Sequence, residues 1–140
     1  MNIEDIMNSD VELVSANTSI KDAAEIMARK GIGFLPVGDD QLRGSITDRD
    51  IVLRAVGSGK DVTATRVADI MSERVLYCRD SDALEDVAQN MGEQQVRRLP
   101  VINEDKRLVG VVSLGDLAPH LSADNLAEAF RGVTGHRKAA

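Results

Sequence analysis

Two short segments carry hydroxyl and carboxyl side chains at a spacing that suits the binding of a sugar and a phosphate. In one, Thr47 is followed three residues later by Asp50; in the other, Ser113 is followed by Asp116, and a glycine precedes each hydroxyl residue by three positions. A helix that begins at such a residue offers free N–H groups and its positive dipole end to phosphate. The acid can accept hydrogen bonds from a ribose diol. The same spacing also forms a capping box, which stabilises a helix start without any ligand.

Two adjacent arginines, Arg97 and Arg98, enter the apolar segment Leu99-Pro100-Val101. Guanidinium groups bind phosphate oxygens through paired, charge-assisted hydrogen bonds. The alternative is a pair of solvated side chains or surface ion pairs, which contribute little to stability. Both interpretations stay open on the residues alone.

The sequence contains no recognisable set of catalytic or metal-binding residues. His120, His136 and Cys78 lack the spacing of metal ligands, and no order of Ser, His and Asp or of Cys and His indicates a nucleophile. Cys78 lies in an apolar run, which favours a buried thiol. Gly57-Ser58-Gly59-Lys60 is too short for a P-loop and follows a predicted helix, which favours a linker. We expect no catalytic residues, no metal, no required cofactor and no enzymatic activity.

The two hydroxyl–acid motifs belong to two copies of one sequence unit. Asp5-Ile6-Met7 is matched by Asp69-Ile70-Met71, and Leu35-Pro36-Val37 is matched by Leu99-Pro100-Val101, in the same order and at the same spacing. Chance does not preserve such order over so long a stretch. The repeat therefore predicts one fold used twice.

Each copy predicts the element order β-α-β-β-α, which defines an α/β fold class. A helix with apolar residues at helical spacing follows the first strand of each copy, and a second helix begins at Thr47 and at Ser113. A final amphipathic helix is expected at Ala123–Arg131, with Leu126, Ala127 and Phe130 on its apolar face. The expected strands are Val11–Val14, Phe34–Val37, Leu42–Ile46, Val75–Cys78, Arg98–Val101 and Leu108–Val112. We place repeat 1 at residues 1–57, a linker at 58–65, repeat 2 at 66–122 and a C-terminal helix and tail at 123–140.

Composition argues against two classes of partner. The net charge of −6 gives no overall basic footprint, and the absence of Trp removes the strongest stacking residue, so nucleic acid is not expected. The acidic N-terminus is unlike a signal peptide, and no apolar run reaches transmembrane length. We therefore expect no membrane partner and a cytoplasmic protein.

The repeated Asp-Ile-Met, Leu-Pro-Val and Gly-x-x-Thr/Ser-x-x-Asp motifs resemble the cystathionine-β-synthase (CBS) domain family over residues 3 to about 121. The chain is similar to stand-alone bacterial CBS pairs of the hypoxic-response type. The resemblance implies two repeats packed with pseudo-twofold symmetry, and clefts that bind AMP, ADP, ATP or S-adenosylmethionine. It also implies a homodimer.

The resemblance further implies roles for individual residues. Asp50 and Asp116 would hold the ribose, and Thr47 and Ser113 would contact ribose or phosphate. In one cleft, Thr18, Ile32 and Gly33 would face Ser113 and Asp116.

In the other cleft, the resemblance implies that Asp82, Val96 and Arg97 face Thr47 and Asp50. Basic side chains at the positions of Arg97 and Arg98 contact phosphates in some members of the family. The two clefts therefore differ in chemistry.

Asp82 is a departure, because its counterpart Thr18 is uncharged and a carboxylate would repel a phosphate unless an arginine offsets it. On this basis the cleft of Thr18 and Asp116 is the better candidate. The function we expect is a regulatory protein that senses an adenine nucleotide and acts on a separate partner protein. The alternative is a dimeric interaction scaffold whose clefts bind nothing.

Overall fold

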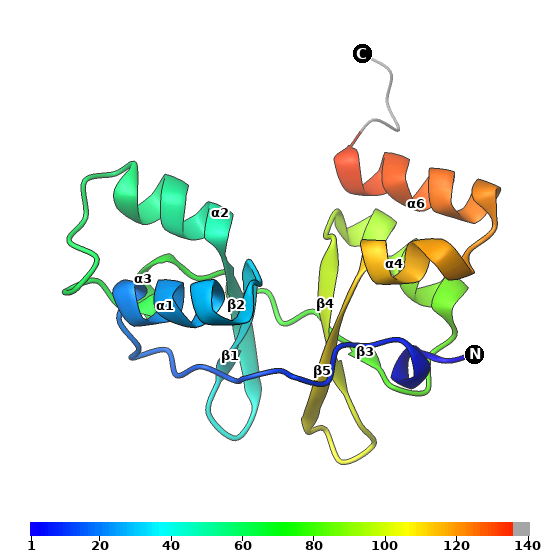
Figure 1. The fold of residues 1–140 in the computed structure, drawn as a ribbon, viewed down its shortest axis with the longest axis horizontal. Helices are drawn as coiled ribbons and strands as arrows, with labels where there is room; N and C mark the ends of the chain where they lie inside the picture. The colour runs from blue at the N-terminus through cyan, green and yellow to red at the C-terminus, as the bar shows by residue number, and fades with distance from the viewer. Residues whose placement is uncertain (136–140) are drawn as a thin grey trace. The chain divides into compact units, whose positions relative to one another are not determined.

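Each repeat builds its sheet around one antiparallel hairpin. The structure is a computed structural model and describes residues 1–135. In the first repeat, β1 (Phe34–Gly38) pairs with β2 (Leu42–Thr47). In the second, β4 (Arg98–Ile102) pairs with β5 (Leu108–Ser113) in the equivalent register (Figure 1). The mixed α/β class and the predicted hairpin strands are confirmed.

The strand that opens each repeat is shorter than predicted. Only β3 (Cys78–Arg79) forms in the second repeat, where it pairs parallel with β4. In the first repeat, a single parallel bridge joins Val14 to Val37. The predicted extents Val11–Val14 and Val75–Cys78 are therefore wrong, because the chain meets the hairpin edge only at the last residue of each prediction.

The first helix of each repeat covers its hairpin with apolar residues at helical spacing. In α1 (Ile20–Lys30), the Ser19 side chain caps the start, and Gly31 ends the helix at a φ of 66°. That left-handed conformation favours glycine. In α4 (Leu84–Gln94), the buried residues are Leu84, Val87, Ala88, Met91 and Gly92.

The second helix of each repeat begins at the predicted hydroxyl residue. Beyond that start, the two repeats continue differently. In the first repeat, α2 (Asp48–Asp50) continues into a π-helical segment, η2 (Ile51–Val56). In the second, α5 (Leu114–Leu117) passes into a short 3-10 turn, η3 (Ala118–His120), which contains Pro119. The chain then starts a new helix, α6 (Ala123–Thr134), which is capped by Ser122.

Small residues make the contact between α6 and α4. Ala129 and Gly132 are the buried residues of α6, and Gly132 lies against the backbone of Gly92. The predicted apolar face is therefore wrong in part, since Phe130 is 53% exposed. Helices that approach this closely leave room only for small side chains at the contact.

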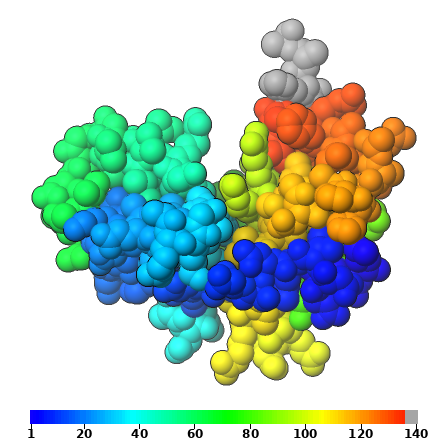
Figure 2. All heavy atoms as spheres, in the orientation of Figure 1, coloured from blue at the N-terminus to red at the C-terminus, as the bar shows by residue number. Residues whose placement is uncertain are grey.

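The compact units of the chain do not coincide with its repeats. One unit comprises residues 12–76; the other combines Met1–Val11 with the residues from Tyr77 on. The N-terminal turn η1 (Ile3–Asp5) thus packs with the second repeat, where the Ile3 amide donates to the Asp82 carbonyl at 3.1 Å. Figure 2 shows the N-terminal residues, in dark blue, against the yellow and orange atoms of that unit. Conversely, α3 (Val67–Ile70) packs in the core of unit 12–76. Each unit is completed by the opening segment of the other repeat.

Candidate ligand-binding site

Both hydroxyl–acid motifs form complete capping boxes. The Thr47 Oγ1 accepts from the Asp50 amide at 3.1 Å, and the Asp50 Oδ2 accepts from the Thr47 amide at 2.9 Å. The corresponding distances for Ser113 and Asp116 are 3.0 and 2.9 Å. Capping therefore uses one oxygen of each carboxylate, and this local arrangement explains why both helices begin where they do.

The second carboxylate oxygen has different surroundings in the two repeats. The Asp50 Oδ1 lies 3.9 Å from the Arg54 Nε, and the Asp50 side chain is only 19% exposed. Asp116 is exposed, and within residues 1–135 its Oδ1 has no hydrogen-bond partner. A ligand hydroxyl therefore has freer access to Asp116 than to Asp50.

The paired arginines lie beside the second motif, at the edge of one pocket. Arg98 on β4 pairs with Ser113 on β5, and the Leu114 amide donates to the Arg97 carbonyl at 2.8 Å. The pocket has a volume of about 390 Å³ and lies wholly within the unit that contains the second repeat. Its lining residues are Arg97, Arg98, Ser113, Leu114, Gly115, Ala118, Leu126 and Phe130.

This pocket combines two kinds of surface. Arg97, Arg98 and Ser113 provide hydrogen-bond donors for an anion, while Leu126 and Phe130 provide apolar contact. A volume of about 390 Å³ is within the usual range for small-molecule sites, which pair apolar walls with a few placed polar groups. The pocket therefore suits an anionic ligand that also carries an apolar group.

The equivalent position in the first repeat has no cationic side chain. Gly33 stands where the second repeat has Arg97, and the Asp48 amide donates to the Gly33 carbonyl at 2.9 Å. The space that a side chain at Gly33 would need is filled by the Asp48 carboxylate. Asp48 and Asp50 are accompanied by Arg49 and Arg54, so charges of both signs are present here, but no arginine stands at the position of Arg97.

The remaining predicted residues lie at the turns that enter the first helices and first hairpin strands. The Thr18 amide donates to Ser15 at 3.0 Å, and its carbonyl accepts from Val67 at 2.8 Å. Asp82 Oδ2 accepts from the Arg79 amide at 2.8 Å, so this carboxylate closes a local turn. Ile32 and Val96 are half-buried just before β1 and β4.

The structure groups the predicted residues by compact unit. Thr18, Ile32, Gly33, Thr47 and Asp50 belong to unit 12–76, and the others belong to the second unit. That residues of one repeat face residues of the other repeat across each cleft remains a prediction. The resemblance assigned Arg97 and Ser113 to separate clefts, whereas both line the pocket described above.

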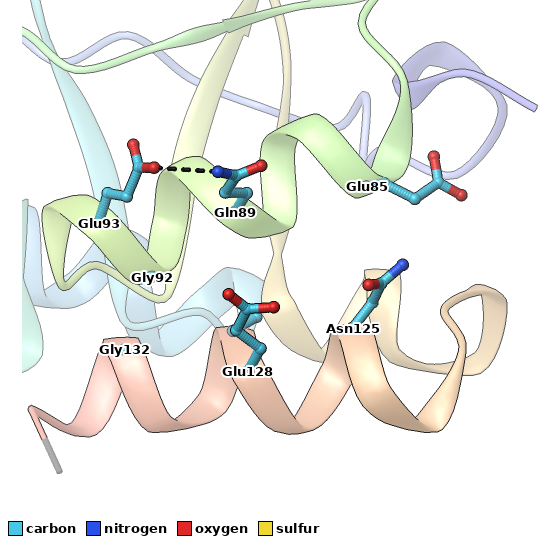
Figure 3. A pocket seen from close by; sticks show the side chains of 8 residues that line it. Glu85, Gln89, Gly92, Glu93, Asn125, Glu128 and Gly132 are labelled. Atoms are coloured by element: carbon cyan, nitrogen blue, oxygen red, sulfur yellow. Dashed lines mark hydrogen bonds between the residues drawn. The ribbon is translucent and has the colours of Figure 1, made fainter. Parts of the chain in front are cut away.

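A second pocket, of about 270 Å³, lies between α4 and α6 and has an acidic lining (Figure 3). Glu85 and Glu93 come from α4, and Glu128 comes from α6. The Gln89 Nε2 donates to the Glu93 Oε1 at 3.1 Å. Three carboxylates make this pocket unsuited to a phosphate.

The sequence motifs did not indicate that α6 contributes to the pocket. Leu126 and Phe130 had been predicted only as part of a packing face. The available signal was composition, since Phe130 is one of only two phenylalanines and the other, Phe34, is buried at 7% exposure. Small residues at the α4 contact leave the large apolar side chains of α6 to face elsewhere.

Cys78 is buried, as predicted, and is not an activated nucleophile. Burial, together with the nearby Asp82 carboxylate, raises the pKa of its thiol to about 12. Within the described residues, no group of three or more His, Cys, Asp and Glu side chains is arranged to hold a metal ion. None of the helices in residues 1–135 is long and apolar enough to cross a membrane. His136 lies outside the described residues.

The chain belongs to the CBS domain family. The family model matches it twice, over residues 3–57 and 67–123. The chain is 40% identical to the CBS domain-containing protein YhcV of Bacillus subtilis over 94% of both chains. It is 34% identical to Hypoxic response protein 1 of Mycobacterium tuberculosis, covering 92% of this chain and 91% of that one. Homoserine O-acetyltransferase of Methanobrevibacter ruminantium is 32% identical, but the match covers only 24% of that enzyme and 86% of this chain.

Solved structures show the same fold. A conserved CBS domain protein of Thermoplasma acidophilum aligns with a TM-score of 0.83 at 28% identity, covering 99% of this chain and 77% of that one. CBSX2, solved in complex with AMP, aligns with a TM-score of 0.69 at 32% identity, over 85% of this chain and 94% of that one. A CBS pair solved with 5′-methylthioadenosine and S-adenosyl-L-methionine aligns with a TM-score of 0.76 at 27% identity, covering 86% of this chain and 94% of that one.

Proposed function

We propose that this protein is a regulatory adenine-nucleotide sensor whose ligand binds in the pocket beside Arg97 and Arg98. The observation that carries the proposal is the meeting of both arginines, Ser113 and an apolar wall in one pocket of about 390 Å³. Arg97 and Arg98 bind the phosphate, Ser113 contributes a hydroxyl, and the free oxygen of Asp116 accepts from the ribose.

Two structural neighbours support the choice of an adenosyl ligand. CBSX2 was solved with AMP, and a second CBS pair was solved with 5′-methylthioadenosine and S-adenosyl-L-methionine. The arginine pair in this chain favours the phosphorylated ligands AMP, ADP and ATP over S-adenosylmethionine, whose sulfonium is positively charged.

The proposed output is a change in a separate partner protein. A ligand shifts a conformational equilibrium only by its difference in affinity for the two states. The nucleotide would therefore stabilise one arrangement of a cytoplasmic homodimer that the partner recognises. Another CBS protein with a similar fold, CBS-CP12, is hexameric, so assembly within the family extends beyond single chains.

Calorimetry with AMP, ATP and S-adenosylmethionine tests the proposal. We expect AMP to bind the unaltered protein, and Arg97→Ala and Arg98→Ala each to weaken binding by about 10- to 100-fold, since a hydrogen bond to a charged group contributes roughly 1.5–3 kcal/mol. Asp116→Asn keeps a capping oxygen and should weaken the binding of AMP less than the two arginine substitutions do. Arg43→Ala removes another exposed arginine, from the other unit, and serves as the control. The absence of heat with all three ligands at millimolar concentration would reject the proposal.

A dimeric interaction scaffold is the second candidate. Two observations favour it: the capping boxes account for Asp50 and Asp116 without a ligand, and η2 exposes Val52, Leu53 and Val56 by 56%, 52% and 60%. The scaffold predicts a stable dimer whose association is the same with and without nucleotide, as measured by analytical ultracentrifugation. A nucleotide-dependent change in association would favour the sensor.

A further inference from the structure

We infer that Phe130 of α6 provides the face on which the adenine base of the ligand stacks, so that the helix after the second CBS repeat sets the preference for a nucleotide over a sugar phosphate. This inference rests on the proposed function and deepens it. The family match ends at residue 123, where α6 begins, so the contribution comes from outside the matched repeats.

The pocket separates its polar and apolar groups onto different elements. Arg98 and Ser113 lie on the two strands of the hairpin and Arg97 directly precedes β4, whereas Leu126 and Phe130 come from α6. Leu114, Gly115 and Ala118, from α5 and η3, complete the lining. A nucleotide has the same division, with a charged phosphate at one end and a flat base at the other. With its phosphate at the arginines, a bound nucleotide directs its base toward the α6 side.

Phe130 is available for such contact because it is not one of the buried residues of α6. The contact with α4 is made by Ala129 and Gly132, while Phe130 remains 53% exposed. A single exposed apolar side chain is unremarkable in itself. The significance of Phe130 is its position at a pocket that also contains two arginines.

The helix that carries Phe130 is well held, so the backbone that bears the ring is positioned before a ligand arrives. The Ser122 Oγ accepts from the Asn125 amide at 3.1 Å and caps the start of α6. The Thr134 Oγ1 donates to the Phe130 carbonyl at 2.9 Å, and Gly132 lies against Gly92. A preorganised side chain loses less conformational freedom on binding, so its contact yields more affinity.

Two ligands separate the contribution of the base from that of the phosphate. AMP carries both groups, whereas ribose 5-phosphate lacks the base. We expect Phe130→Ala to weaken AMP by about tenfold, in line with the measured worth of stacking between a base and an aromatic side chain. Ribose 5-phosphate should bind equally well to both proteins. Phe130→Leu keeps an apolar side chain of similar helix propensity and should show most of the same loss for AMP, because it has no ring.

Phe130→Trp supplies a direct spectroscopic readout. The protein contains no tryptophan, so the introduced indole is the sole reporter. We expect AMP to quench its fluorescence with the same dissociation constant that calorimetry gives, and AMP affinity to be retained or improved. Ribose 5-phosphate should leave the fluorescence unchanged.

The outcomes distinguish this inference from the proposed function. If Arg97→Ala weakens AMP but Phe130→Ala does not, the sensor proposal stands and the inference is overturned. Equal losses of AMP and ribose 5-phosphate in Phe130→Ala would also overturn it, because they would indicate a general structural effect. If the unaltered protein binds no adenine nucleotide, both fail together.

Discussion

Gly33 and Arg97 occupy equivalent positions, yet they give the two repeats different chemistry. The Gly33 carbonyl accepts from the Asp48 amide at 2.9 Å, and the Arg97 carbonyl accepts from the Leu114 amide at 2.8 Å. Asp48 and Leu114 are the first residues of α2 and α5. This backbone hydrogen bond is thus the same in both repeats. The difference lies in the side chains, because an acid packs over a glycine in one repeat and an apolar residue accompanies an arginine in the other.

At the residue scale, Gly33→Ala should destabilise the protein by about 1 kcal/mol. The new methyl group would overlap the Asp48 carboxylate, whose Oδ1 is held by the Arg49 amide at 2.8 Å. In an Asp48→Ala background the cost should vanish, and alanine could stabilise slightly by restricting the unfolded chain. Urea unfolding of the unaltered protein, the two single variants and the double variant measures this coupling. The same loss in both backgrounds would show that the contact is not the cause.

At the element scale, two glycines in the contact between α4 and α6 differ in the space available for a side chain. A Cβ at Gly132 would lie 2.7 Å from the Cα and 2.8 Å from the carbonyl oxygen of Gly92. A Cβ at Gly92 would find its nearest neighbour, the Ala129 carbonyl oxygen, at 3.4 Å. Backbone atoms cannot move aside as a flexible side chain can, so the two positions tolerate a methyl group very differently.

Gly132→Ala should therefore destabilise by about 1–3 kcal/mol, although alanine has the better helix propensity. Gly92→Ala is the matched control, and it should be neutral or stabilising because its methyl group has ordinary van der Waals room. Thermal unfolding of both variants tests the pair. A stabilised Gly132→Ala would mean that the helices are not held this closely.

At the scale of the whole molecule, the opening segment of each repeat completes the unit that contains the other repeat. Ile3 is fully buried with the second repeat, and Ile70 is 3% exposed in the core of unit 12–76. This exchange predicts that a core substitution loosens the unit in which the residue packs, and not the repeat to which it belongs by sequence.

The same substitution at both positions tests the exchange. Ile3→Ala should lower stability by about 2–5 kcal/mol and reduce amide protection mainly in β4, β5 and α4. Ile70→Ala should instead reduce protection mainly in α1, β1 and β2. Hydrogen exchange followed by mass spectrometry resolves these segments. Loss of protection in the same unit for both variants would contradict the exchange.

Local features of the fold were predictable from the sequence. The helix starts at Thr47 and Ser113 and the left-handed helix end at Gly31 follow from interactions within about four residues. The repeat made the predictions of the hairpin and of the helix starts at Thr47 and Ser113 stronger, since these features occur in both copies. The same locality made the hydroxyl–acid motifs and the arginine pair recognisable as candidate ligand contacts.

The sequence by itself thus determined the repeated α/β fold and the family, and it indicated candidate ligand contacts. Only the tertiary structure decided that the opening segments exchange between units, that Asp48 fills the space beside Gly33, and that Phe130 lines the pocket with Arg97. The physical reason is that these features depend on steric fit between residues far apart in the chain. A helical pattern indicates an apolar face, but the size of the side chains at the helix contact decides which members of that face stay exposed.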